Sequence, residues 1–288
     1  YAEQHFYRKD KNSNLVVVTS AGGSGRKRGI EDVTRFLSFA VEECGASSRY
    51  RPKLSAALKN QLIGTRDVDS KVGRKTIPLK DEQFSDFLDW LQVNGKNQLR
   101  LAVGLVGYFG LRECELALVM PTETANGLQL KVGMQAKANA KTRSAPPKEP
   151  RTAMYAKCKD RPEHEAMDML AQYHSGFVTF PKRLRKQIDQ VGKKGFFRDV
   201  GDAFSEQVKS TQFWKDLVKT EPEMKPNSLR HSFAWRVHQS TEMIVPTRAV
   251  AAAMGHTHQT HMRYYAEFID PDQVRKVFEA FNKSAQSA

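Results

Sequence analysis

The chain has 288 residues, enough for one large domain or two of medium size. Hydrophobic residues make up 40% of it and charged residues 27%, which excludes a chain that is disordered throughout. The formal net charge of +14 and the isoelectric point of about 9.7 predict an anionic partner, and nucleic acid is the commonest one for a protein this basic.

Neither a membrane span nor a disulfide framework is predicted. The longest apolar run, 101–111, is far shorter than the roughly 20 residues that cross a bilayer. The start shows no signal peptide, and because the chain begins at Tyr1 rather than Met, we expect its natural start further upstream. Cys44, Cys114 and Cys158 show no Cys-x-x-Cys pairing, so neither a zinc site nor disulfides are expected, which fits a reducing, intracellular compartment.

The first 77 residues read as an arm, a linker and a small helical region. The stretch 20–29 is rich in glycine and basic residues, and we expect a flexible linker. It lacks the Gly-Lys-Ser/Thr ending of a phosphate-binding loop, so that alternative is discounted. Apolar residues at helical spacing predict a helix over 30–44 and a second one over 52–62. The charged segment 65–77 follows as an interdomain linker that could lie along a phosphate backbone.

A second, longer domain is predicted from Pro78 onward. Asp81 is expected to cap a helix with an apolar inner face, and the helix that follows, 98–109, is apolar nearly all round and therefore buried. A strand is predicted over 128–134, with 151–156 as its hairpin partner across a long basic loop. Further helices are predicted over 163–173, 182–190, 202–219, 228–238, 247–254 and 272–281.

These patterns predict a mainly α fold with a small antiparallel β-sheet, an α+β class. The predicted domains are an N-terminal arm and linker (1–29), a small helical domain with a linker (30–77) and a large helical domain (78–288).

Gly110-Leu111-Arg112-Glu113-Cys114-Glu115-Leu116 is the first segment with chemical potential. Arg112 follows a buried helix, where a charge is costly unless it meets a partner. One interpretation is a structural ion pair with Glu115, three residues on. The other is a fixed guanidinium that Glu115 orients toward a phosphate.

Pro226-Asn227-Ser228-Leu229-Arg230-His231-Ser232-Phe233-Ala234 is the second segment. Pro226 favours a helix that starts just after it, capped by Asn227 or Ser228. Asn227 and Arg230 are three residues apart and can face one site, where the helix start would suit an anion. A solvated helix face is the alternative. His231 lies about 100° further round, so we expect it to pack or bond elsewhere.

Met254-Gly255-His256 and Tyr264-Tyr265 form the third segment. Gly255 is a good left-handed cap, which would hold His256 in a rigid position. The tyrosines have an alternative interpretation as half-buried residues of an amphipathic helix. The spacing of His256, His258 and His261 does not place all three on one helix face, so no metal site is predicted.

In their order and spacing the three segments resemble the tyrosine recombinase (phage integrase) family, over about 78–281. The family's first box is Gly-Leu-Arg-x-x-Glu-Leu, and the match is complete. Its second box is His-x-x-Arg, and here Asn227 stands where histidine, or sometimes lysine, is usual. Because an amide cannot shuttle protons near neutral pH, acid–base help at this position is in question. The third box is Leu-Gly-His, followed about nine residues later by the nucleophilic tyrosine.

The resemblance implies site-specific DNA cleavage and rejoining through a covalent 3′-phosphotyrosyl intermediate, as in integration or excision of a mobile element, with neither metal nor cofactor. Two arginines would grip the phosphate, a histidine would donate to it, a tyrosine would attack, and a lysine would protonate the leaving 5′ oxygen. Tyr265 is the expected nucleophile, with Tyr264 as the alternative, and Lys137 is the alternative lysine. The implied site residues are Arg112, Lys141, Asn227, Arg230, His256 and Tyr265.

The resemblance also implies partners. Residues 30–77 would correspond to part of the family's core-binding domain and form half of a clamp around double-stranded DNA. An apolar face in 272–281 would dock on a neighbouring protomer, giving a homo-tetramer on two duplexes from a monomer or dimer. A cytoplasmic protein of a bacterium, archaeon or phage is expected. A type IB topoisomerase-like nicking enzyme and a catalytically silent DNA-binding relative, with Asn227 as the sign of decay, are the alternatives.

Overall fold

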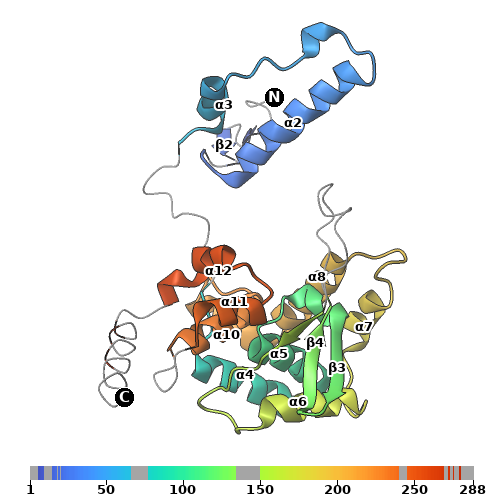
Figure 1. The fold of residues 1–288 in the computed structure, drawn as a ribbon, viewed down its shortest axis with the longest axis vertical. Coiled ribbons are helices and arrows are strands. Elements are labelled where there is room, and N and C mark those ends of the chain that lie inside the picture. Colours follow the sequence, from blue (N-terminus) through green and yellow to red (C-terminus); the bar gives the residue numbers. More distant parts are fainter. Residues whose placement is uncertain are drawn as a thin grey trace. The chain divides into compact units, whose positions relative to one another are not determined.

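A computed structural model describes residues 6–9, 15–17, 19, 21–65, 77–133, 150–239 and 245–268, together with 272, 275 and 279. The chain divides into two compact units, Tyr1–Lys75 and Thr76–Ala288 (Figure 1). The predicted general acid Lys141 and its alternative Lys137 lie outside the described residues, as does most of the helix predicted over 272–281.

The first unit pairs a short hairpin with two helices. Its elements are β1 (Tyr7–Lys9), β2 (Leu15–Val17), α2 (Ser24–Glu42), a 3-10 turn (Ser48–Tyr50) and α3 (Ala56–Ile63). The strands β1 and β2 are antiparallel. Helix α3 starts at a true cap, because the Ser55 hydroxyl accepts from the backbone N–H of Leu58 at 3.1 Å, and the helix ends at Gly64.

Helix α2 begins inside the glycine-rich stretch that was predicted to be a flexible linker. Residues 24–29 form its first turns, so the prediction is wrong for this part. Arg26 gives the physical reason. Its side chain is buried, donates to the backbone oxygen of Thr19 at 2.7 Å and lies 4.5 Å from the centre of the Phe6 ring. These contacts offset the poor helix propensity of the glycines.

The second unit is mainly helical and carries a small sheet, which confirms the predicted fold class. Its elements are α4 (Asp81–Val93), α5 (Asn97–Phe109), the 3-10 helix η2 (Glu113–Leu118), β3 (Val119–Thr124), β4 (Gly127–Val132), β5 (Arg151–Ala153), α6 (Glu165–His174), α7 (Lys182–Ile188), α8 (Phe197–Ser210), α9 (Gln212–Thr220), α10 (Ser228–Gln239), α11 (Thr247–Ala253), α12 (His258–Tyr265) and the 3-10 helix η3 (Ala266–Phe268).

The sheet has the antiparallel order β3-β4-β5, with Thr124 opposite Gly127 and Val132 opposite Arg151. The predicted pairing of β4 with β5 is confirmed. The strand β3 was not predicted, although it forms the hairpin with β4. Its Pro121 cannot donate a ladder hydrogen bond, and such a residue is tolerated because β3 is an edge strand.

Helix α5 is the centre of the main core, and ten of its 13 residues, Leu99 and 101–109, are buried, as predicted. Helices α4, α6 and α10 all contact it. The predicted cap at Asp81 is wrong. Lys80 precedes the helix, and Asp81 is its first residue, whose carboxylate instead accepts from Arg236 Nε on α10 at 2.7 Å and from the Lys159 backbone N–H at 3.1 Å.

The single helix predicted over 202–219 is two helices, α8 and α9. Thr211 separates them in an extended conformation, and its hydroxyl accepts from the Trp214 backbone N–H at 3.3 Å, capping α9. The indole of Trp214 is thereby directed into the core. None of the described helices is both long and apolar enough to cross a membrane.

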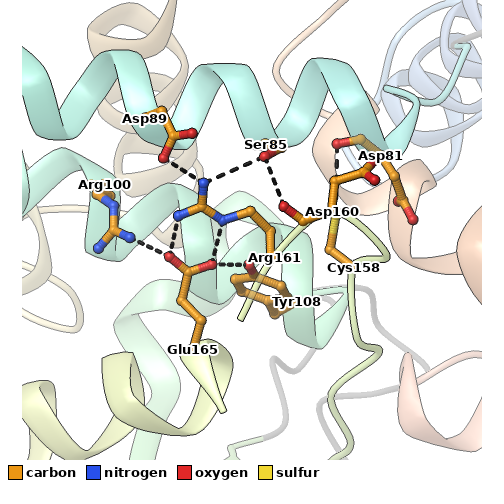
Figure 2. A network of polar contacts seen from close by, with 9 residues as sticks. All are labelled: Asp81, Ser85, Asp89, Arg100, Tyr108, Cys158, Asp160, Arg161 and Glu165. Atoms are coloured by element: carbon orange, nitrogen blue, oxygen red, sulfur yellow. Dashed lines mark hydrogen bonds and ion pairs between the residues drawn. The ribbon is translucent and has the colours of Figure 1, made fainter. Parts of the chain in front are cut away.

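A buried polar network joins α4, α5 and the start of α6 (Figure 2). Glu165 is its centre and accepts hydrogen bonds from Arg100, Arg161 and the Tyr108 hydroxyl. Arg161 also bonds Asp89 of α4. Burial alone would raise the pKa of Glu165, but these donors hold it below its usual value, so the carboxylate stays ionised among them. The network fixes how three core helices pack.

Candidate active site

A cavity of about 620 Å³ in the second unit gathers residues from all three sequence segments. It is lined by Arg112, Glu113, Cys114, Arg198, Gly201, Asp202, Ser205, Asn227, Arg230, His231, His256, Tyr264 and Tyr265. Five of the six predicted site residues are therefore brought together, from the end of α5, the start of α10 and the ends of α11 and α12. The sixth, Lys141, lies outside the described residues.

Arg112 is held by Glu115 in two ways. The Arg112 backbone N–H and its Nη1 each donate to the Glu115 carboxylate at 2.8 Å. Both interpretations made from the sequence meet here, because the ion pair exists and the guanidinium still lines the cavity with 37% of the side chain exposed. The charge is oriented by its partner and remains accessible to an anion.

Glu115 is shared by three arginines, one of which sequence reasoning missed. Arg151 Nη2, at the start of β5, donates to Glu115 Oε2 at 2.9 Å, and Arg230 Nη1 lies 3.6 Å from the same oxygen. Burial of Glu115, which is 4% exposed, acts to raise its pKa, but the three guanidiniums outweigh burial and lower it. The only signal for Arg151 in the sequence was its place after a basic loop.

Arg230 is 2% exposed and is stabilised by two helix ends. Its Nη1 donates to the carbonyl of Gly110, which ends α5 in a left-handed conformation (φ 59°), and its Nη2 donates to the carbonyl of Met254 at 2.7 Å, at the end of α11. Both carbonyls lie at the negative ends of helix dipoles, which favour a cation. Burial, and then the charge of Arg112, lowers the pKa of Arg230 to about 10, so it stays charged near neutral pH.

His256 accepts rather than donates at Nε2. Arg230 Nη2 lies 2.7 Å from this nitrogen, and a guanidinium has no acceptor, so Nε2 must be unprotonated. Burial, followed by the charges of Arg230 and Arg112, lowers the pKa of His256 to about 3. The ring is therefore neutral with its proton on Nδ1, which is buried and has no partner among the described residues.

Tyr265 lies within the group of arginines and histidines, whereas Tyr264 faces outward. The side chains are 2% and 56% exposed. The Tyr265 ring stacks on that of His256, with centroids 5.8 Å apart and planes 19° apart. Burial raises the pKa of Tyr265, while the charge of Arg230 and its contact with the hydroxyl act in the opposite direction. The phenol is therefore protonated near neutral pH.

The expectation that His231 points away from the site is wrong. It lines the cavity, and its ring centre is 5.0 Å from that of Tyr265. Helix α10 begins at Ser228, directly after Asn227, so Asn227 and His231 lie one turn apart on one face, and Asn227 Nδ2 is 3.2 Å from His231 Nε2. His231 therefore lines the cavity together with Asn227 and Arg230, the two residues of this segment that the sequence predicted to face the site.

The arrangement suits a bound anion. Three guanidiniums face one ionised carboxylate, so the positive charge exceeds that of Glu115, and burial raises the pKa of the neighbouring Glu113. Within the parts of the chain that the structure describes, no group of three or more His, Cys, Asp or Glu residues is placed to hold a metal ion. Arg112 and Arg230 bring two positive charges to the cavity that Tyr265 also lines.

No protein-family model matches this sequence, and neither does any curated protein. Among solved structures, it is similar to the XerA recombinase, at 14% identity over 87% of this chain and 82% of that chain, with a TM-score of 0.42. It is also similar to the XerH site-specific recombinase bound to palindromic difH substrate in a post-cleavage complex (14%, 88% and 72%, TM-score 0.41). The Tn1549 transposon integrase in complex with transposon right end DNA is a third (15%, 94% and 88%, TM-score 0.39). These structures are tyrosine recombinases, but at such values the likeness transfers no residue role to this chain.

Proposed function

We propose that this chain is a site-specific DNA recombinase of the tyrosine type, which cleaves and rejoins strands through a covalent 3′-phosphotyrosyl intermediate. The observation on which the proposal rests is the position of Tyr265, with its hydroxyl beside the buried Arg230, in a cavity that Arg112 and His256 also line. A tyrosine, two arginines and a histidine around one cavity would supply a nucleophile and the positive charge and hydrogen bonds that a phosphodiester transition state needs.

In the proposed reaction the two arginines bind the non-bridging oxygens of the scissile phosphate. Tyr265 Oη attacks phosphorus, the bond to the 5′ oxygen breaks, and the phenolic proton passes to a base. Arg112 and Arg230 stabilise the extra negative charge of the pentavalent transition state, because they are already fixed by Glu115 and by helix carbonyls. Attack by another 5′ hydroxyl on the phosphotyrosine reverses these steps.

Lys141 is proposed as the acid that protonates the leaving 5′ oxygen, with Lys137 as the alternative. Both fall between β4 and β5, whose ends meet where Val132 pairs with Arg151. Arg151, the first residue of β5, donates to Glu115, so the end of this segment is next to the site in sequence. Neighbouring guanidiniums would lower the pKa of such a lysine and a bound phosphate would raise it, so the lysine would carry its proton before cleavage and could donate it to the leaving oxygen.

Double-stranded DNA is the proposed partner, and a homo-tetramer on two duplexes the proposed working assembly in integration or excision. The basic balance of the chain favours a polyanion. Contacts to phosphates would make binding strongly salt-dependent, and we expect the affinity to fall steeply between 50 and 200 mM salt.

Covalent trapping tests the proposal. The full chain is incubated with a pool of nicked duplexes that includes the DNA flanking its own coding sequence, and protein–DNA adducts are then sought under denaturing conditions. We expect an adduct with the wild type and with Tyr264→Phe, and none with Tyr265→Phe. Each variant removes one phenolic hydroxyl, and the two tyrosines are neighbours that line the same cavity. Tyr264→Phe is therefore the matched control for Tyr265→Phe.

Each other outcome has a defined meaning. An adduct that persists in Tyr265→Phe would show that the nucleophile is wrong. Tight, salt-sensitive binding to the cognate duplex without any adduct would favour a silent DNA-binding relative, for which Asn227 in place of histidine is the observation in favour. Adduct formation with relaxation of supercoiled DNA but without strand exchange between duplexes would favour a topoisomerase-like enzyme.

A further inference from the structure

The proposed reaction needs an acceptor for the proton of Tyr265, and most groups around it are unsuitable. Burial keeps the phenol protonated near neutral pH, so the proton must leave during attack. Guanidiniums have no acceptor atom. The Glu115 carboxylate is already occupied by Arg112 and Arg151. Asn227 stands where the family's second box has histidine, and an amide does not take up protons near neutral pH.

Three histidines surround the Tyr265 ring, and their partners distinguish them. His261 is fully buried, does not line the cavity, and is paired with His238, with 2.9 Å between their Nε2 atoms. His256 accepts at Nε2 from Arg230, which places its proton on Nδ1 and leaves it no spare acceptor. His231 lines the cavity, and its partner at Nε2 is the neutral amide of Asn227.

A carboxamide partner can either donate or accept a hydrogen bond, whereas a guanidinium can only donate. The side chain of Asn227 can present either its NH₂ group or its oxygen to His231 Nε2, because the two ends of the amide are nearly the same size and shape. With the oxygen presented, Nε2 keeps its proton and Nδ1 is an acceptor. His231 Nδ1 is buried and has no hydrogen-bond partner among the described residues, Tyr265 included, so the Tyr265 phenol, whose ring centre is 5.0 Å away, has to turn toward it for the proton to pass. When Nδ1 takes up a proton, Nε2–H still donates to the amide oxygen.

We infer that His231, held by Asn227, accepts the phenolic proton of Tyr265 as Tyr265 Oη bonds to phosphorus, and returns it when the phosphotyrosine is resealed. The pair would thus do together what a single histidine at position 227 does in the family pattern. The proton balance closes, since Tyr265 loses one proton to His231 and the 5′ oxygen gains one from the proposed lysine. The inference rests on the proposed function.

The electrostatic setting agrees with this role. Burial, and then the charges of Arg230 and Lys225, lowers the pKa of His231 to about 4, so the ring is neutral and able to accept in the absence of DNA. A bound phosphodiester would bring a negative charge that opposes those of Arg230 and Lys225. The basicity of His231 would then rise at the time when the proton has to be taken up.

The test compares single-turnover cleavage rates of four full-length proteins on the nicked duplexes described above, between pH 5 and 9. They are the wild type, His231→Gln, Asn227→His and the double variant that combines both changes. We expect His231→Gln to cleave on the order of 100-fold more slowly or worse at neutral pH, with unchanged DNA binding, as is typical for the loss of a general base. The double variant should recover most of this loss, because it restores a histidine at position 227.

A second substrate separates the base from the acid. A 5′-bridging phosphorothiolate has a leaving group that needs no proton. On this substrate His231→Gln should cleave more slowly than the wild type by the same factor as on the ordinary duplex. Lys141→Ala, which is slow on the ordinary duplex, should cleave the phosphorothiolate at nearly the wild-type rate. A deficit that disappears on the phosphorothiolate would assign His231 to the leaving group and overturn the inference, as would a His231→Gln rate within about threefold of the wild type.

Further variants keep the inference testable if His231→Gln does not fold. Asn227→Asp retains His231 and places a carboxylate beside it, which should move the acidic limb of the pH–rate profile to higher pH. An unmoved limb would overturn the inference. Glu113 is the rival base, so a loss confined to Glu113→Gln would assign the role there. If the wild type forms no adduct, the proposed function fails together with this inference, whereas a wild-type adduct with an unaffected His231→Gln refutes the inference alone.

Discussion

Replacing Glu115 by glutamine should strongly destabilise the second unit, because this one carboxylate separates three guanidiniums. Glu115 is 4% exposed, accepts from the Arg112 backbone and side chain at 2.8 Å and from Arg151 at 2.9 Å, and lies 3.6 Å from Arg230. Glutamine keeps the shape but removes the charge. It also turns one acceptor into an NH₂ group that faces an arginine.

The magnitude follows from the burial of the cluster. Removing one partner of a buried ion pair costs about 3–5 kcal/mol, since the remaining charges stay desolvated. For a domain of about 200 residues each kcal/mol lowers the melting temperature by about 2–4 °C. The melting temperature of Glu115→Gln should therefore fall by roughly 6–20 °C relative to the wild type. Added sulfate should restore part of the loss, because an anion in the cavity replaces the missing negative charge.

Differential scanning calorimetry of wild type, Glu115→Gln and Glu113→Gln is the assay. Glu113 is the matched control, since it lies two residues away on the same 3-10 helix but no arginine side chain is hydrogen-bonded to it among the described residues, and burial raises its pKa. Its variant should lose less than half as much stability. A Glu115→Gln protein that melts within about 2 °C of the wild type, or no lower than Glu113→Gln, would refute the reasoning.

Two further predictions concern stability. Burial lowers the pKa of His261 to about 4, below the unfolded value of about 6.5, so its contribution to stability is full above pH 6.5 and is lost as the pH falls toward 4. The part of the free energy of unfolding in urea that His261 contributes should fall by roughly 2–3 kcal/mol between pH 7 and 4.5, in addition to the losses from His231 and His256, whose pKa values are also lowered. A His261 imidazole that titrates near pH 6.5 by NMR would contradict this. Gly110→Ala should cost more than the ~1–2 kcal/mol of left-handed strain alone, because a Cβ there would lie 2.7 Å from the Phe233 ring. Gly95→Ala, which has a similar φ but open space around it, should show only the strain, and equal urea midpoints for the two variants would show that the close contact has no effect.

Local sequence patterns were sufficient to locate helices whose position depends on apolar spacing and on residues at their own ends. Apolar periodicity located α4, α5 and α10 to within a few residues, and Gly255 marked a helix end that the structure places in a left-handed conformation. Elements that depend on partners elsewhere were missed. The first turns of α2 are stabilised by the contact of Arg26 with Thr19, and the edge strand β3 is defined by its pairing with β4.

The candidate site shows the same division. The order and spacing of the three segments by themselves determined that Arg112, Asn227, Arg230, His256 and Tyr265 deserve to be considered together. Only the tertiary structure decided that they line one cavity and that Tyr265, rather than Tyr264, is buried among the charges.

Two features of the site could not have come from the sequence. Arg151 joins Glu115, 36 residues away, and donates to the carbonyl of Ala253, 102 residues away. No periodicity or spacing records such contacts, because they arise only when β5 and α11 pack in one unit. His231 lines the site because it lies in the first turn of α10, which begins at Ser228. The packing of α10 against α5 determines which face of that turn points toward the cavity.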